Sequence, residues 1–84
     1  MGLGGAVELA AVRRSWRAVV GQEVAAHCWP LALVHGRLVV ATDHPAWASE
    51  LRALSQELLV GVRAAAPSVQ TMTVQVSPDR GRDW

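Results

Sequence analysis

The residues WPLALVHGRLVVATDHPAWASELRALSQELLVGVRAAA, at positions 29–66, have the pattern of a tight β-hairpin that runs straight into one long helix. His35 and Gly36 separate two apolar runs, and a two-residue connection with glycine favours the primed turns that match strand twist. This turn places Val34 opposite Arg37. Because side chains alternate between faces, the inner face is predicted to carry Leu31, Leu33, Leu38 and Val40, with Leu31 opposite Val40. The outer face is predicted to carry Ala32, Val34, Arg37, Val39 and Ala41.

The long helix is predicted to run from Pro45 to Ala66. The polar residues 42–44 precede Pro45, which suits a capped helix start with proline in the first turn. Apolar residues then recur at steps of three and four, the spacing of one helix face: Trp47, Leu51, Leu54, Leu58, Val62 and Ala65. Gly61 lies inside this run and is predicted to mark the close approach of another backbone.

The flanking segments add a helix before this stretch and a strand after it. The first helix begins near Ala6 and has one apolar stripe, formed by Leu9, Val12, Trp16, Val19 and Val20. Gly21 breaks it before a short second helical turn with Val24, Ala25 and Cys28. Residues Val69–Val76 have strand character, with Met72, Val74 and Val76 predicted to face inward and Thr71, Thr73 and Gln75 outward. This strand is parallel to the second hairpin strand if it pairs directly with it.

The predicted fold is therefore α+β, in the order helix, short helix, strand, strand, long helix, strand. A three-stranded sheet has its helices on one face only, and its other face is mixed in polarity. Residues 6–76 form the single predicted domain, and residues 1–5 and 77–84 are predicted to be flexible termini.

Composition narrows the class of protein. The chain has 84 residues, near the size at which one core is just sufficient, and half of them are hydrophobic, which argues against disorder. No apolar stretch approaches the roughly 20 residues of a membrane span, and no secretory signal is recognised. Cys28 is the only cysteine, which suits a reducing cytoplasm. A net charge of +1 predicts no strong, purely electrostatic grip on nucleic acid.

The sequence has none of the familiar arrangements for catalysis or metal binding. His27, Cys28, His35 and His44 lack the spacing of metal ligands, so no metal or other cofactor is predicted. There is no nucleophile elbow and no GxxxxGK[ST] phosphate loop. We therefore expect a binding protein without a small-molecule substrate, and not an enzyme.

Two features permit alternative interpretations. Arg13, Arg14 and Arg17 lie off the apolar stripe of the first helix, where they form either a solvated face or a small basic patch for DNA or an acidic protein. Trp47 either packs in the core at the start of the long helix or stands partly exposed and anchors a partner, a role in which tryptophan is over-represented.

The order of several motifs resembles the DciA family over roughly residues 9–76. The similarity is carried by Trp16, Val19, Val20, Gly21, Ala25, His27 and Pro30, by Gly36, Leu38 and Val40, and by Pro45, Ala46, Trp47, Ala48 and Leu51. The resemblance implies a KH-like α+β domain that associates with the bacterial replicative DNA helicase and assists its loading onto DNA at replication initiation. It also implies that no ATPase activity is needed. The structural signatures among these residues are Trp16, Gly21, Leu38, Val40 and Leu51.

The residues assigned to contact the helicase or DNA are hypotheses. Contact with the helicase is assigned to Trp47, Arg52 and the outer sheet face at Val34 and Arg37. Weak contact with single-stranded or double-stranded DNA is assigned to Arg13, Arg14 and Arg17.

The sequence leaves two alternative functions open. A KH-like domain could bind RNA, but KH domains clamp the RNA backbone with a GXXG loop between helices, and the only such sequence here, GLGG at residues 2–5, is at the amino terminus. A small interaction or dimerisation domain of unrelated role is the third possibility.

Overall fold

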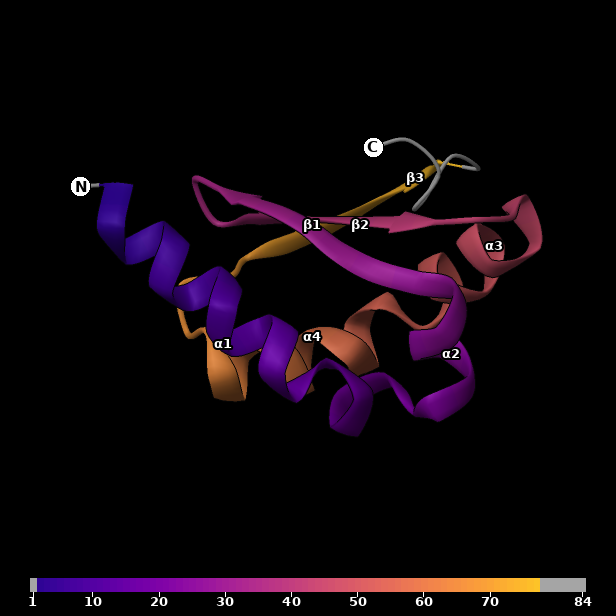
Figure 1. The fold of residues 1–84 in the computed structure, drawn as a ribbon, viewed down its shortest axis with the longest axis horizontal. Helices are drawn as coiled ribbons and strands as arrows, with labels where there is room; N and C mark the ends of the chain where they lie inside the picture. The colour runs from indigo at the N-terminus through magenta and orange to yellow at the C-terminus, as the bar shows by residue number, and fades with distance from the viewer. Residues whose placement is uncertain (1, 78–84) are drawn as a thin grey trace.

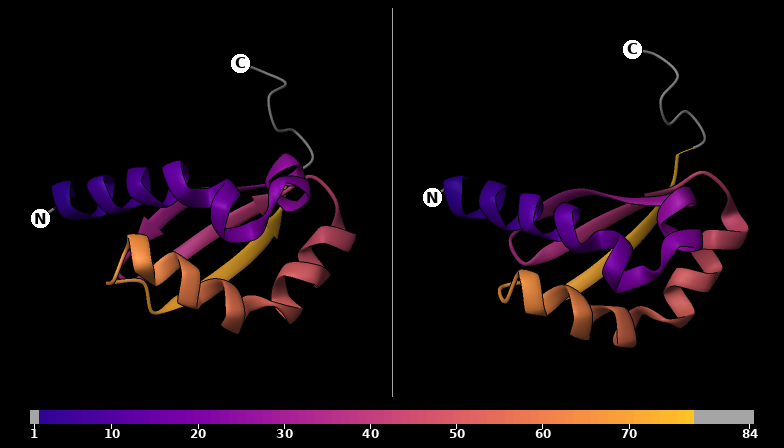
Figure 2. Two further views of the ribbon diagram at one scale, coloured as in Figure 1. Left: turned by 90° about the horizontal axis from the view of Figure 1, so that it is seen from below. Right: turned by 60° about the horizontal axis from the view of Figure 1, so that its bottom comes forward.

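The computed structural model describes residues 2–77, with side chains from residue 6 onward, and it confirms the α+β fold (Figure 1). Its elements are α1 (Gly2–Val20), α2 (Gln22–His27), β1 (Cys28–Val34), β2 (Arg37–Thr42), α3 (Pro45–Ala53), α4 (Ser55–Ala65) and β3 (Thr71–Val76). The sheet has the order β1-β2-β3, with β1 antiparallel and β3 parallel to the central strand β2. All the helices lie on one face of it, α1 beneath β1 and α3 and α4 along β3 (Figure 2).

The hairpin has the predicted turn. His35 and Gly36 both have positive φ, 50° and 79°, as a primed turn requires. Glycine is also needed for space, because a Cβ at Gly36 would lie 3.2 Å from the carbonyl oxygen of Ser68. The register Val34–Arg37, Leu33–Leu38 and Ala32–Val39 is as predicted.

Beyond these three pairs the predicted register is wrong. The register shifts between Pro30 and Ala32, so that Pro30 and not Leu31 lies opposite Val40. The cause is the missing N–H of proline. Without a bulge, Pro30 would fall opposite Ala41 in a pair that exchanges main-chain hydrogen bonds, which proline cannot complete. The bulge moves Pro30 to a pair that needs no N–H and leaves Leu31 40% exposed instead of in the core.

The predicted single long helix is also wrong, because two helices replace it. The chain leaves α-helical geometry at Leu54, with φ −99° and ψ 8°, where the Leu54 N–H points to the carbonyls of both Glu50 and Leu51. An unbroken helix of 22 residues would be about 33 Å long, against about 20 Å for a six-residue strand. The break keeps both halves against the sheet.

The amino-terminal helices follow the predicted pattern except at two points: α1 starts earlier, and Cys28, predicted in the short second helix, is the first residue of β1. Gly21 separates α1 from α2 with φ 93° and ψ 157°, a conformation that is almost confined to glycine. Helix α1 already begins at Gly2, inside the segment 1–5 that was expected to be flexible. Of the expected flexible segment 77–84, all but Ser77 lies outside the described residues.

The core forms where the inner face of the sheet meets the helices. Its buried members include the predicted Val12, Trp16, Leu38, Val40, Leu51, Leu58 and Val62, with Leu33 packed against them. Strand β3 turns Met72 and Val74 towards this core. Val76 shares their face by alternation, but it is 40% exposed and does not join the core. At Gly61 the close neighbour is a side chain, since a Cβ there would lie 2.9 Å from Val19 Cγ1. Among the described residues, no helix is both long and apolar enough to cross a membrane.

Candidate partner interface

Trp47 lies where the hairpin meets α2 and α3, and it is half-buried. Its indole stacks on the imidazole of His27, with the ring centroids 5.1 Å apart and the planes inclined by 14°. His27 Nδ1 is in turn 3.0 Å from Asp43 Oδ2. The other carboxylate oxygen, Asp43 Oδ1, is buried and has no hydrogen-bond partner among the described residues. Trp47 is thus packed against the core and partly exposed, and its contact with a partner stays a prediction.

The β-bulge is what brings this cluster together. Without the register shift, His27 would continue the hairpin opposite His44. With it, Cys28 lies opposite Thr42 and His27 falls beside Asp43, whose N–H donates to the His27 carbonyl at 3.1 Å. The Thr42 hydroxyl donates to the same carbonyl at 2.9 Å.

The start of α3 fixes Trp47 from the other side. His44 is the N-cap residue, and its Nδ1 accepts a hydrogen bond from the Ala46 N–H at 3.1 Å. Pro45 occupies the first turn, as predicted. Trp47 therefore projects from a capped first turn and does not depend on a loop for its position.

Three arginines bind main-chain carbonyls along the two edges of the sheet. On the β1 side, Arg13 donates from Nε to Pro30 and from Nη2 to Leu31, both at 3.2 Å. On the β3 side, Arg52 Nη2 donates to Val74 at 3.1 Å. Arg63 donates to the two carbonyls that precede β3, those of Val69 at 2.8 Å and Gln70 at 3.0 Å. We call these three residues the edge-capping arginines: Arg13, Arg52 and Arg63. Their guanidinium groups satisfy carbonyls that would otherwise face solvent or another chain.

These hydrogen bonds limit the partner contacts that were predicted for Arg13 and Arg52. Both side chains are exposed, but each is committed to the sheet edge. The side chains of Arg14, Arg17 and Arg37 are on exposed residues and make no hydrogen bond with the described residues. Within residues 6–77, the positive charge that remains available to a partner therefore comes from these three side chains.

The outer sheet face carries no helix (Figure 1). Strands β1 to β3 contain no acidic residue, and Arg37 is their only charged side chain. Val34, directly opposite Arg37, is 46% exposed. Thr71, Thr73 and Gln75 are exposed, as the alternation predicted. This face is weakly apolar and neutral to positive in charge.

The structure does not bring the predicted helicase contacts into one patch. Val34 and Arg37 flank the hairpin turn, whereas Trp47 follows the far end of β2, roughly 17 Å away at 3.4 Å per residue. Arg52 and Trp47 share α3, but Arg52 reaches β3 and Trp47 reaches α2. Two separate surfaces therefore result.

The five signature residues have structural roles. Leu38, Val40 and Leu51 are fully buried, and Gly21 supplies the helix break. Trp16 is buried, and its Nε1–H donates to the Cys28 carbonyl at 2.9 Å, which ties α1 to the start of β1.

Sequence reasoning missed the His27–Asp43 pair and the edge-capping arginines. The signal for the pair was Pro30, because a proline at a hydrogen-bonded position of a hairpin predicts a bulge and hence the shifted register. The edge caps had no signal in the sequence, since they depend on how helices and strand edges lie in space. Within the described part of the chain, no group of three His, Cys, Asp or Glu side chains is placed to hold a metal ion.

Comparison with known proteins gives one family. The family model described as "Dna[CI] antecedent, DciA" matches residues 1–74. A UPF0232 protein of Mycolicibacterium smegmatis is 36% identical over 69 residues, which is 82% of this chain and 36% of that relative. A UPF0232 protein of Mycobacterium tuberculosis H37Rv is 33% identical over 82% of this chain and 37% of its own length. One of Mycobacterium ulcerans is 31% identical over 99% of this chain and 44% of its own length. The chain thus spans well under half of the length of these relatives.

Proposed function

The chain belongs to the DciA family, and from that premise we propose that it is a non-enzymatic DNA-replication initiation factor that binds the replicative DNA helicase and assists its loading onto DNA. The match over residues 1–74, which reaches from α1 into β3, is the observation that carries the proposal. The family description, an antecedent of Dna[CI], supports a role in helicase loading. In this proposal the protein acts in the cytoplasm and the helicase supplies the ATP chemistry.

Trp47 is the proposed anchor of the helicase contact. Tryptophan is enriched among the residues that dominate binding energy, and here the indole is pre-oriented by the His27 stack and by the capped start of α3. A side chain that is already ordered loses little rotamer freedom when a partner covers it. Val34 and Arg37 on the outer sheet face are a second, separate contact in this proposal.

Direct DNA contact is proposed to be weak. Arg14 and Arg17 are three residues apart on α1 and so lie on one side of the helix, whereas Arg13 is committed to β1. If these two arginines neutralise about two phosphates, the slope of log K against log salt is about −2. Such a contact would guide the complex along DNA and would not hold it there.

The test is binding to the cognate replicative helicase. The wild-type protein is expected to co-elute with the helicase in gel filtration and to increase helicase loading on circular single-stranded DNA. Trp47→Ala should weaken binding by about thirtyfold, the equivalent of about 2 kcal/mol. Val60→Ala is the matched control, since Val60 is 70% exposed on α4 and far along the chain from Trp47.

Two results would contradict the proposal at different levels. Unchanged affinity for Trp47→Ala, with the circular dichroism spectrum intact, removes Trp47 from the interface. Absence of any wild-type complex removes the helicase as the partner. A salt-sensitive shift of single-stranded RNA without helicase contact would instead support the RNA-binding alternative.

A further inference from the structure

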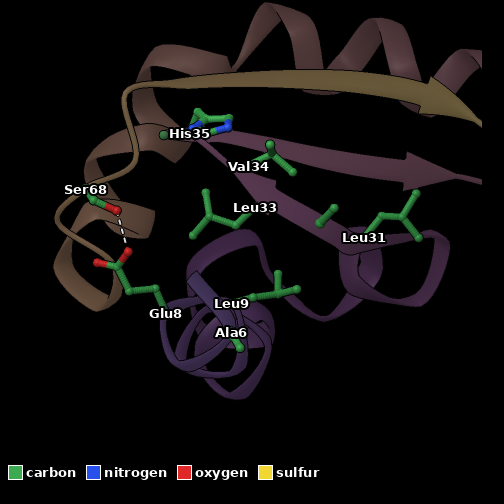
Figure 3. A pocket seen from close by; sticks show the side chains of 10 residues that line it. Ala6, Glu8, Leu9, Leu31, Leu33, Val34, His35 and Ser68 are labelled. Atoms are coloured by element: carbon green, nitrogen blue, oxygen red, sulfur yellow. Dashed lines mark hydrogen bonds between the residues drawn. The ribbon is translucent and has the colours of Figure 1, made fainter. Parts of the chain in front are cut away.

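A groove runs between the amino-terminal half of α1 and the free edge of β1 (Figure 3). Its volume is about 670 Å³, and its described lining is mainly apolar: Ala6, Leu9, Leu31, Ala32, Leu33 and Val34. In Figure 3, Leu9 of α1 and Leu33 of β1 lie on opposite sides of it, and Leu31 lies further along β1. Exposed apolar side chains, Leu31 at 40% and Val34 at 46%, border the space.

The groove follows the edge of β1 and not one face of the sheet. Its lining includes the consecutive residues Leu31, Ala32, Leu33 and Val34, whose side chains cannot all point to one face. In a hairpin closed by a two-residue turn, the residues flanking the turn exchange main-chain hydrogen bonds, and the next residue has its N–H and C=O on the opposite side. The N–H and C=O of Leu33 therefore face the free edge, beside the groove.

Arg13 marks the end of this usable edge. It binds the carbonyls of Pro30 and Leu31, and Pro30 has no N–H to offer. The edge is thus capped at the bulge and open at Leu33, next to the apolar wall. An extended segment placed there can pair its main chain with Leu33 and direct alternate side chains into the groove, the geometry of strand addition.

The charge at the groove indicates which side chains the bound segment carries. Glu8 is the only carboxylate in the described lining, which contains no arginine, and Glu8 accepts a hydrogen bond from the Ser68 hydroxyl. A lining that holds a carboxylate and no arginine does not suit the phosphates of nucleic acid and favours a basic side chain instead. A bulky apolar residue beside a basic one matches both the wall and this rim.

From these observations we propose that the groove between α1 and the edge of β1 docks a short extended segment of the replicative helicase, in which a bulky apolar residue lies next to a basic residue. The segment adds as a strand to β1 at Leu33. This inference rests on the proposed function, since it takes the helicase as the source of the segment, and it adds a third contact that is distinct from Trp47.

The test fills the groove without disturbing the core. Ala6 is exposed on α1, so Ala6→Trp places an indole in the groove, and Leu31→Arg places a charge on its apolar wall. Matched controls are Ala64→Trp and Val60→Arg, both at exposed positions of α4. Each groove variant should weaken helicase binding at least tenfold while the controls bind as the wild type does. If Leu31→Arg loses the wild-type circular dichroism spectrum, Ala6→Trp decides.

Hydrogen exchange resolved to single amides tests the strand pairing itself. The Leu33 amide should exchange fast in the free protein and become protected at least tenfold in the helicase complex. The Ala32 amide, paired with Val39 across the hairpin, should be slow in both states. Protection at Leu33 together with weakened groove variants supports the inference.

Every other outcome overturns it, in distinguishable ways. Groove variants that bind as well as the wild type, or an unprotected Leu33 amide, overturn the docking site and leave helicase binding intact. A wild-type protein that does not bind the helicase overturns the proposed function and the inference together. Self-association that Ala6→Trp abolishes would assign the groove to a second copy of the chain.

Discussion

Replacing Gly21 by L-alanine should destabilise the domain by a net value of about 1–2 kcal/mol, because backbone strain outweighs the loss of flexibility in the unfolded chain. At φ 93° and ψ 157°, a residue with a Cβ is strained by about 1–3 kcal/mol. No atom outside the immediate chain neighbours lies within 4 Å of the Cβ position, so steric overlap adds nothing. The lost flexibility of the unfolded chain offsets the strain by about 0.4–1 kcal/mol. The Gly21 N–H, which donates to the Arg17 carbonyl at 2.9 Å, is retained by alanine.

The assay is thermal unfolding followed by circular dichroism, with urea denaturation as a check. A domain of this size loses about 4–8 °C per kcal/mol, so the midpoint should fall by about 4–16 °C. The matched control is D-alanine at the same exposed position, introduced by peptide ligation, because a D-residue accepts positive φ. D-alanine should leave stability unchanged or raise it slightly. The reasoning is refuted if L-alanine is as stable as glycine, or if D-alanine is equally destabilising.

Three further substitutions test the packing. Trp16→Phe should cost about 1–3 kcal/mol in urea denaturation with an unchanged m-value, because it removes the buried hydrogen bond from the indole N–H to the Cys28 carbonyl; a neutral result would mean that this hydrogen bond contributes no net stability. Gly61→Ala should destabilise the domain, because the new Cβ meets Val19, although alanine gains about 1 kcal/mol in helix propensity. Adding Val19→Ala should restore stability in a double-mutant cycle. Arg13→Gln should lower stability by about 0.5–1.5 kcal/mol and increase self-association in sedimentation, whereas Arg14→Gln should change neither; equal behaviour of the two would disprove edge capping.

The fold was predictable from sequence as far as local pattern specifies it. The His35-Gly36 turn set the register of three strand pairs, and the stripes with Trp16, Leu51 and Leu58 located the core. Pro30 carried the signal for the bulge, but recognising it requires asking whether each hairpin position needs an N–H. Because the signal of Pro30 was not used, Leu31 was predicted in the core and the contact between His27 and Asp43 was not predicted.

The break at Leu54 was not predictable in the same way. No glycine or proline stands there, and the apolar spacing continues through it. Its cause is the length of the helical segment relative to the strands, a property of the assembled layers. For the candidate site, Trp47 was proposed from the sequence and stays a prediction. Its stack on His27 and the hydrogen bonds of Arg13 and Arg52 to the strand edges could be found only from the three-dimensional arrangement.

The parallel pairing of β3 with β2 has a consequence for how the protein matures. The hairpin of β1 and β2 can form locally. The central strand β2 gains its second neighbour only when the chain has returned along α3 and α4 and placed β3 beside it. During synthesis, Thr71–Val76 leave the ribosome after α1–α4, β1 and β2, so one side of β2 stays unpaired until then. Arg52 would meanwhile lack its acceptor on Val74. Chains stalled before position 71 should therefore be preferred targets for chaperones and proteases.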